Sequence, residues 1–197
     1  MSDTGPEKLR FKEIEHKFVL DDQFDLEAFG AALAVLNPTR TTSISVLDTY
    51  YLIDGRGGFV IRHRYDEELH HLTLKALAAD TEVRDEINLD LGHHAGNQQA
   101  QVDAFLRQIG VIWSGSLRKE LTVWYFPDIE VVHYHASSDT RAVQCVEFEA
   151  THKPSLAEAL ETVHRYEQAT GFDRATRSSR SLPEILFPEF DAHLSKR

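Results

Sequence analysis

The chain has 197 residues, of which 42% are hydrophobic and 27% are charged, as in ordinary globular proteins. Its formal net charge of −11 argues against sequence-independent binding to DNA or RNA, which depends on Lys and Arg neutralising phosphates. The single cysteine, Cys145, excludes an intrachain disulfide, and no apolar run reaches the roughly 18 residues of a membrane span. The first residues lack the apolar stretch of a secretory signal, so we expect a cytoplasmic protein without nucleic-acid or membrane partners.

The N-terminal half is expected to consist mostly of strands. Charged and apolar residues alternate over 11–20, which predicts the first strand. An apolar stripe over 25–36 predicts a helix that ends at Asn37-Pro38. A β-rich run follows at 43–54, and a glycine-rich turn ends it. Further strands separated by short turns are expected at 59–65, 72–77 and 83–91.

The C-terminal half adds the remaining strands, which are expected at 116–126, 129–136 and 142–150. Helices are expected at 97–110, ending at Gly110, at 155–171, with Ser155 as N-cap, and at 182–186. Eight strands joined mostly by short turns predict an α+β fold, with an antiparallel sheet closed or nearly closed into a barrel. We expect a single domain over 10–190, between a flexible N-terminus at 1–9 and a tail at 191–197.

Polar stripes run along the expected strands. Glu13, Glu15 and Lys17 share one face of the first strand, because residues two apart point the same way. The same alternation recurs at Arg62 and Arg64, Thr73 and Lys75, Arg84 and Glu86, Arg118 and Glu120, and Glu147 and Glu149. These faces are either solvated surface or the lining of a barrel with a polar interior that holds one small ligand. A lining with both signs of charge suits a polyanion and its metal ions, since carboxylates bind hard cations and Arg binds phosphate.

The charged motifs of these strands, taken in their order along the chain, resemble those of the CYTH superfamily, also called triphosphate tunnel metalloenzymes. The resemblance rests on Glu13-x-Glu15-x-Lys17, DTYYL, Arg62-x-Arg64, LTLK, Arg84-x-Glu86 and VEFE, and it extends from about 11 to 186. It implies an eight-stranded antiparallel β-barrel with a polar interior, the triphosphate tunnel, and helices packed outside. Members bind triphosphates with divalent metal and hydrolyse or rearrange them; they include class IV adenylyl cyclases and thiamine triphosphatases.

The resemblance also implies roles for individual residues. The expected metal ligands, for Mg²⁺ or Mn²⁺, are Glu13, Glu15, Glu147 and Glu149. The triphosphate is expected to be bound by Lys17, Arg62, Arg64, Lys75, Arg84, Arg118 and Arg180, with Glu86 orienting the basic groups. The expected catalytic residues are Glu13, Glu15, Lys17 and Arg180. Lys119 is the alternative to Arg118, and alternation with Glu120 favours Arg118.

Two departures from the family pattern stand out. The C-terminal Lys-Ser-Tyr of the family is replaced by Arg180-Ser181-Leu182, and an always-charged arginine is a poor general base. The aspartate that many members carry on the penultimate strand is replaced by the run His133-Tyr134-His135. The other paired histidines, His70-His71 and His93-His94, fall in expected turns and loops, which indicates surface positions rather than a zinc site.

Three functions remain open. The first is metal-dependent hydrolysis of a triphosphate: inorganic tripolyphosphate, a nucleoside triphosphate or thiamine triphosphate. The second is a class IV-type adenylyl cyclase that makes cyclic AMP and pyrophosphate from ATP, although no adenine-reading constellation is visible. The third is a non-catalytic module that binds polyphosphate or a nucleotide, which the replacement at Arg180 motivates. We favour the hydrolase because it needs only the triphosphate site. The oligomeric state stays open, with a homodimer among the options.

Overall fold

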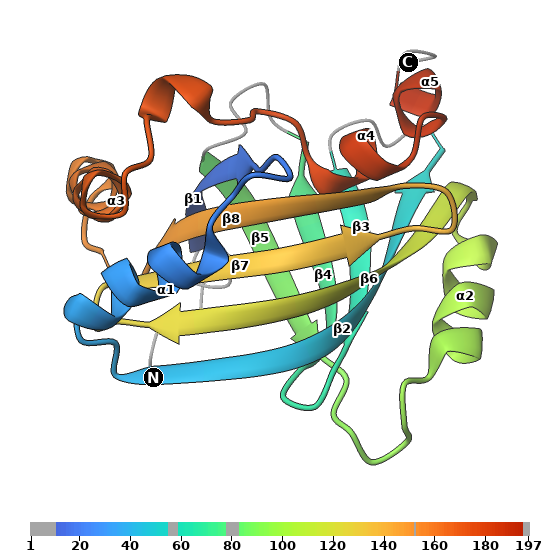
Figure 1. The fold of residues 1–197 in the computed structure, drawn as a ribbon. Helices are drawn as coiled ribbons and strands as arrows, with labels where there is room; N and C mark the ends of the chain where they lie inside the picture. The colour runs from blue at the N-terminus through green and yellow to red at the C-terminus, as the bar shows by residue number, and fades with distance from the viewer. Residues whose placement is uncertain (1–10, 55–58, 78–82, 152, 195–197) are drawn as a thin grey trace.

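The computed structural model describes residues 11–54, 59–77, 83–151 and 153–194, and for 11–13 and 83–85 it describes the backbone alone (Figure 1). Eight antiparallel strands close into one barrel in the order β1-β5-β4-β3-β2-β6-β7-β8, which confirms the predicted α+β barrel. The strands are β1 Phe11–Val19, β2 Arg40–Ile53, β3 Phe59–Tyr65, β4 His70–Ala76, β5 Val83–Asp90, β6 Val111–Tyr125, β7 Ile129–Ser137 and β8 Ala142–Ala150. The N-terminus expected at 1–9 lies outside the described residues.

Strand pairing explains how the barrel closes. β2 to β5 form one run of hairpins and β6 to β8 a second, and the long strands β2 and β6 join the two runs. β1 closes the circle, because its first residues pair with β5 and the rest pair with β8. β2 and β6 both begin earlier than expected, since they pair from Arg40 opposite Tyr125 to Ile53 opposite Val111 and so satisfy each other's backbone groups.

Helices cover the outside of the barrel: α1 Leu26–Val35, α2 Gln99–Gln108 and α3 Leu156–Ala169 (Figure 1). α1 and α3 pack on the outer faces of β1, β6, β7 and β8, where Phe29 and Val163 join Phe18 and Phe148 in one apolar cluster. The predicted N-cap is confirmed, since the Ser155 side chain accepts a hydrogen bond from a backbone N–H in the first turn of α3. α2 covers β2 and β3. In the described parts of the chain, no helix has the length and apolar character needed to cross a membrane.

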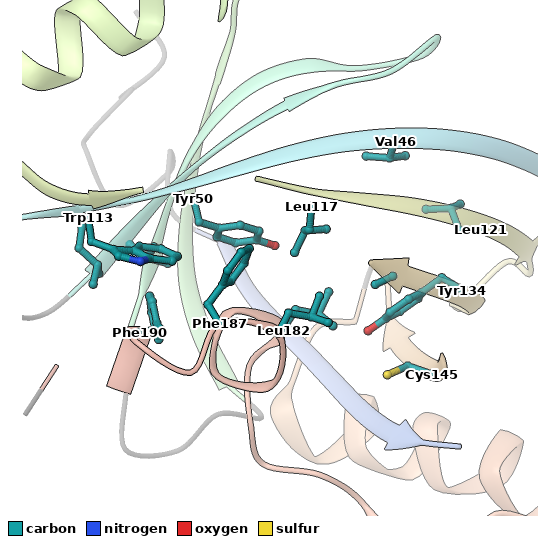
Figure 2. Packing of buried hydrophobic residues seen from close by; sticks show 14 of the residues in the cluster. Val46, Tyr50, Trp113, Leu117, Leu121, Tyr134, Cys145, Leu182, Phe187 and Phe190 are labelled. Atoms are coloured by element: carbon teal, nitrogen blue, oxygen red, sulfur yellow. The ribbon is translucent and has the colours of Figure 1, made fainter. Parts of the chain in front are cut away.

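The C-terminal segment closes one end of the barrel with α4 Leu182–Leu186 and α5 Phe190–Leu194, which follow a single 3₁₀ turn at Arg174–Thr176. Figure 2 shows Leu182, Phe187 and Phe190 beside inward-pointing residues of β2 and β6. The ring centroids of Phe187 and Phe190 lie 5.2 Å and 4.9 Å from that of Trp113. The tail expected from 191 is therefore helical to Leu194, because Phe190 anchors it in this apolar cluster.

Substituting Gly115 with alanine is expected to destabilise this closed end. A Cβ at this position would lie 2.7 Å from the indole of Trp113 and 2.9 Å from the ring of Phe187, which is too close for carbon atoms. Overpacking of this kind costs about 1–3 kcal/mol, to be measured by urea denaturation. Ser114→Ala, on the exposed face of β6, is the matched control, and equal stability of both variants would contradict the packing described.

Candidate functional site

A cavity of about 300 Å³ lies inside the barrel, and residues of all eight strands, α4 and α5 line it. It is at the small end of the range for ligand pockets in proteins. The lining includes eight of the residues expected from the sequence: Glu15, Lys17, Arg62, Arg64, Lys75, Glu86, Glu147 and Glu149. The fold thus brings most of the expected site to one enclosed space, although its members come from five different strands.

Carboxylates of β1 and β8 surround the buried ammonium of Lys17. Its Nζ lies 3.2 Å from Oε1 of Glu15 and 3.1 Å from Oε1 of Glu147. Glu15 pairs across the strands with Glu149, so the two Glu-x-Glu motifs lie side by side. Tyr134 of β7 donates a hydrogen bond of 2.5 Å to Glu147 from its hydroxyl. Glu15 and Lys17 of β1 therefore both face the cavity, and each lies beside a group of opposite charge.

Basic side chains of β3, β4 and β6 face the same cavity. Lys75 forms a buried ion pair with Glu86 of the neighbouring strand. Arg62 donates from one terminal nitrogen to Thr73 at 3.4 Å, while its Nε is buried without a hydrogen-bond partner in the described structure. Leaving a buried donor unsatisfied is costly, so this N–H is suited to an acceptor that arrives with a ligand.

Asp48 of β2 is the fully buried anchor of the basic groups. Both its oxygens accept hydrogen bonds of 2.8 Å from Arg64, in a bidentate pair, and Lys119 Nζ lies 3.2 Å from Oδ2. Burial would raise the pKa of Asp48, but the charges of Arg64 and Lys119 outweigh it and hold that pKa well below its usual range. Asp48 is therefore ionised and holds two cations toward the cavity.

The expectation for Arg118 is wrong as to position, and Lys119 is the residue that lines the cavity. Arg118 is exposed on the outside of β6, where it donates to the Ser45 hydroxyl at 3.4 Å. Inside the barrel Lys119 alternates with Leu117 and Leu121. Alternation with Glu120 indicated the wrong face because this strand presents mainly apolar residues to the interior.

Arg180 does not line the cavity either. Its side chain is 54% exposed, donates to the backbone carbonyl of Glu184, and lies 3.7 Å from a carboxylate oxygen of Asp191. Ser181 forms a capping box with Glu184, and the start of α4 turns Arg180 outward. The side chains of Glu13 and Arg84 lie outside the described residues, although their backbones pair with each other between β1 and β5.

Sequence reasoning missed two residues, Asp48 and Tyr134. Asp48 belongs to the DTYYL motif, and its parity with Val46 and Tyr50 was the signal that could have placed it inside. Tyr134 belongs to the run that replaces the family's aspartate, and its hydroxyl reaches the Glu147 carboxylate from the penultimate strand. His133 lies outside the barrel instead, 2.7 Å from the Gln144 amide and stacked on Phe24.

A metal ion could be held by the carboxylates of β1 and β8. Mg²⁺ is commonly bound by one or two carboxylates together with substrate phosphates, and oxygen ligands are the donors it prefers. Glu15, Glu147 and Glu149 supply such oxygens at the cavity wall. Within the described ranges no group of three or more His, Cys, Asp or Glu side chains is gathered closely enough to hold a metal alone. These carboxylates therefore fit a metal ion whose remaining ligands are oxygens of a bound phosphate.

His70, which was expected at the surface, forms a buried pair with His63 of strand β3. His70 is 1% exposed, and its Nε2 lies 3.0 Å from Nε2 of the equally buried His63. The other ring nitrogen of His63 lies 3.0 Å from Oε1 of Gln99 in α2, and that of His70 lies 2.5 Å from the Gly92 carbonyl. The expectation for His70 was wrong because β4 begins at this residue and directs its ring toward His63 and the Gly92 carbonyl.

Acid is expected to destabilise the fold through this pair. Burial lowers the pKa of His63, and two protonated rings 3.0 Å apart would repel each other. The unfolded chain therefore binds more protons than the folded one below about pH 6.5, the ordinary pKa of histidine. The free energy of unfolding is therefore highest above this pH. It falls by on the order of 1 kcal/mol as the pH is lowered from about 7.5 to about 5.5.

Urea denaturation across this pH range measures the effect. His63→Gln should flatten the pH dependence, whereas His94→Gln, at an exposed position, should leave it unchanged. A pH dependence that is identical in the wild type and His63→Gln would show that His63 does not cause it.

Solved structures from archaea, bacteria and plants share this fold. The PH1012 protein of Pyrococcus horikoshii aligns over 88% of this chain and 99% of its own, with a TM-score of 0.70 and 13% identity. A candidate adenylate cyclase from Bacillus halodurans aligns over 91% and 99%, with a TM-score of 0.62 and 17% identity. A candidate adenylyl cyclase from Hippeastrum, with a dominant triphosphatase activity, aligns over 92% and 95%, with a TM-score of 0.53 and 12% identity.

No protein-family model and no curated protein matches the sequence. At identities this low, the likeness to solved structures concerns the backbone rather than the chemistry. The closed barrel agrees with the folds of those structures over 88% and 91% of this chain. The chain therefore shares the closed eight-stranded barrel of these structures, as the resemblance of its motifs implied.

Proposed function

We propose that the protein hydrolyses a triphosphate compound inside the barrel, with a divalent metal ion bound beside the substrate. The observation that carries the proposal is Arg62, whose buried Nε–H points at no acceptor among the described residues while its neighbours Arg64, Lys75 and Lys119 line the same cavity. Arg side chains suit phosphate oxygens because their donors lie in one plane. The triphosphatase activity of the Hippeastrum protein, which has this fold, supports the same reaction class.

A bound cation is part of the proposal because of the charge of the cavity. Carboxylates outnumber Lys and Arg side chains in its described lining, so a bare triphosphate would meet net repulsion. Glu15, Glu147 and Glu149 would hold Mg²⁺ or Mn²⁺, with Glu13 as a further ligand by its place in the motif. When bound, the ion supplies charge that offsets the phosphates and activates water for attack.

The side chains of the barrel would do the positioning that phosphoryl transfer mainly requires. Arg62, Arg64 and Lys119 would bind the phosphate oxygens, with Asp48 fixing the orientation of the last two. Lys75 would add a further positive charge, held in place by Glu86. These fixed charges would stabilise the charge that develops on the transferred group, and they need no reorganisation during the reaction.

The closed end of the barrel restricts how a substrate enters. α4 and α5 cover one end, where Leu182 and Phe190 reach the cavity lining. The proposed reaction therefore takes a substrate with a terminal triphosphate, which enters from the opposite end and releases its product there.

A substrate panel tests the proposal. Tripolyphosphate, ATP, GTP and thiamine triphosphate are incubated with Mg²⁺ or Mn²⁺, while orthophosphate, pyrophosphate and cyclic AMP are followed together. We expect metal-dependent release of orthophosphate. Pyrophosphate together with cyclic AMP would establish a cyclase instead. Binding of a triphosphate without any product would point to a binding module.

A further inference from the structure

We infer that Tyr134 is a positioning residue for the proposed metal site, because its hydroxyl holds the Glu147 carboxylate in the orientation that binds the ion. This inference rests on the proposed function for the role of Glu147 as a metal ligand. The contact is a hydrogen bond of 2.5 Å between the Tyr134 hydroxyl and Oε1 of Glu147. Tyr134 stands in the run of β7 that replaces the aspartate of the family pattern, so the shared motifs do not include this contact.

The register of β7 and β8 places these two side chains on the same wall of the cavity. Tyr134 lies opposite Cys145 and Val132 lies opposite Glu147, so Tyr134 and Glu147 are diagonal neighbours across the two strands. Diagonal neighbours on one face of a sheet are within reach of an aromatic side chain. Both residues line the cavity. The phenol therefore reaches the carboxylate directly from the neighbouring strand.

The Tyr134 side chain is held in place by its surroundings. It is 1% exposed and belongs to the same apolar cluster as Leu121, Cys145 and Leu182 of α4 (Figure 2). The Nζ of Lys119 lies 5.2 Å from the centroid of its ring, within the range of a cation–π contact. A side chain packed in this way keeps its rotamer, and a fixed donor is what a precise metal site requires.

Two donors meet at one oxygen of Glu147. Its Oε1 accepts the hydrogen bond of Tyr134 and lies 3.1 Å from Nζ of Lys17. Within the described residues no hydrogen bond reaches Oε2, so this oxygen is the one that remains for a ligand in the cavity. Without the phenol, the carboxylate is free to rotate and to turn either oxygen toward Lys17, and the ammonium then competes with a metal ion for it. Tyr134 therefore reserves one carboxylate oxygen for the metal.

Tyr134→Phe tests the inference, because it removes the hydroxyl and keeps the ring that faces Lys119. Mn²⁺ is titrated into the protein in the presence of inorganic phosphate, which supplies oxygen ligands, and electron paramagnetic resonance gives the concentration of free ion. We expect the dissociation constant of Mn²⁺ to rise by about 10–100-fold, the usual effect of removing a group that orients a metal ligand. The double variant Tyr134→Phe with Glu147→Gln should bind Mn²⁺ no more weakly than Glu147→Gln alone, because Tyr134 acts through Glu147.

Tyr51→Phe is the matched control, since Tyr51 is also buried and also donates from its hydroxyl to a carboxylate. That hydrogen bond, of 2.6 Å to Asp103 of α2, lies on the outside of the barrel, where Tyr51 packs with residues of α2. Urea denaturation should show a similar loss of stability in both variants, because each loses one buried hydrogen bond. Only Tyr134→Phe should change the affinity for Mn²⁺. A purely structural role of Tyr134 would leave the Mn²⁺ affinities of the two variants equal.

The outcomes separate this inference from the proposed function. An unchanged affinity for Mn²⁺ in Tyr134→Phe, additive losses in the double variant, or no binding of Mn²⁺ to the wild type would each overturn the inference, even if hydrolysis of a triphosphate is observed. An affinity for Mn²⁺ that falls in Tyr134→Phe and depends on Glu147, in a protein that hydrolyses none of the triphosphates, would support the inference and reject the hydrolase.

Discussion

Asp48→Asn is expected to lower the free energy of unfolding by about 3–5 kcal/mol, the usual cost of removing one partner from a buried ion pair. The asparagine keeps the shape of the side chain but not the charge that faces Arg64 and Lys119. Both cations are mostly buried, so neither can exchange its lost partner for bulk water. Urea denaturation measures the change directly.

The matched control is Asp128→Asn, which breaks ion pairs with Lys153 and Arg165 near the surface. Asp128 is 25% exposed, so this change should cost less than about 1 kcal/mol. Tripolyphosphate should stabilise Asp48→Asn more than the wild type, because the anion can replace the missing charge. Equal stability of the two variants would mean that Asp48 does not anchor the basic side chains.

Glu147→Gln is expected to reduce metal-dependent kcat/KM by about 10²–10³-fold, the scale seen when one electrostatic group is removed from an active site. The amide removes a negative charge from the proposed metal ligands and from the neighbour of Lys17. It can still accept the hydrogen bond of Tyr134, so the barrel should keep its fold. Hydrolysis assays over a range of metal concentrations should show a weaker apparent metal affinity.

Glu161→Gln, at an exposed position of α3, is the control for the loss of one carboxylate. Circular dichroism of both variants checks that secondary structure is retained. Full activity of Glu147→Gln at every metal concentration would rule out its role as a metal ligand.

The sequence determined the barrel and most of the cavity lining, because alternation along a strand is a local property. A face of Glu15 and Lys17, or of Arg62 and Arg64, can be read from residues two apart, wherever the strand lies. The order of such motifs along the chain was enough to identify the fold. Helix ends could be predicted as well, since a cap such as Ser155 acts within one turn.

Tertiary structure decided what alternation alone leaves open. In β6 the apolar residues Leu117 and Leu121 share the face of Lys119, and the expectation of a polar interior assigned that face to the outside of the barrel. Only pairing with β2 and β7 turned Lys119 inward. Arg180 carried a family motif, yet the capping of α4 turned it to the surface.

Asp48 shows the physical reason most clearly. Its partners come from two different neighbours of β2: Arg64 lies opposite it in the β2–β3 hairpin, whereas Lys119 is distant in the sequence and reaches it only because β6 pairs with the other edge of β2. The aliphatic part of the cavity lining likewise forms only when β2, β6 and β7 become neighbours. Strand periodicity fixes which residues share a face, whereas the charges and surfaces that meet across the cavity depend on pairing between distant strands.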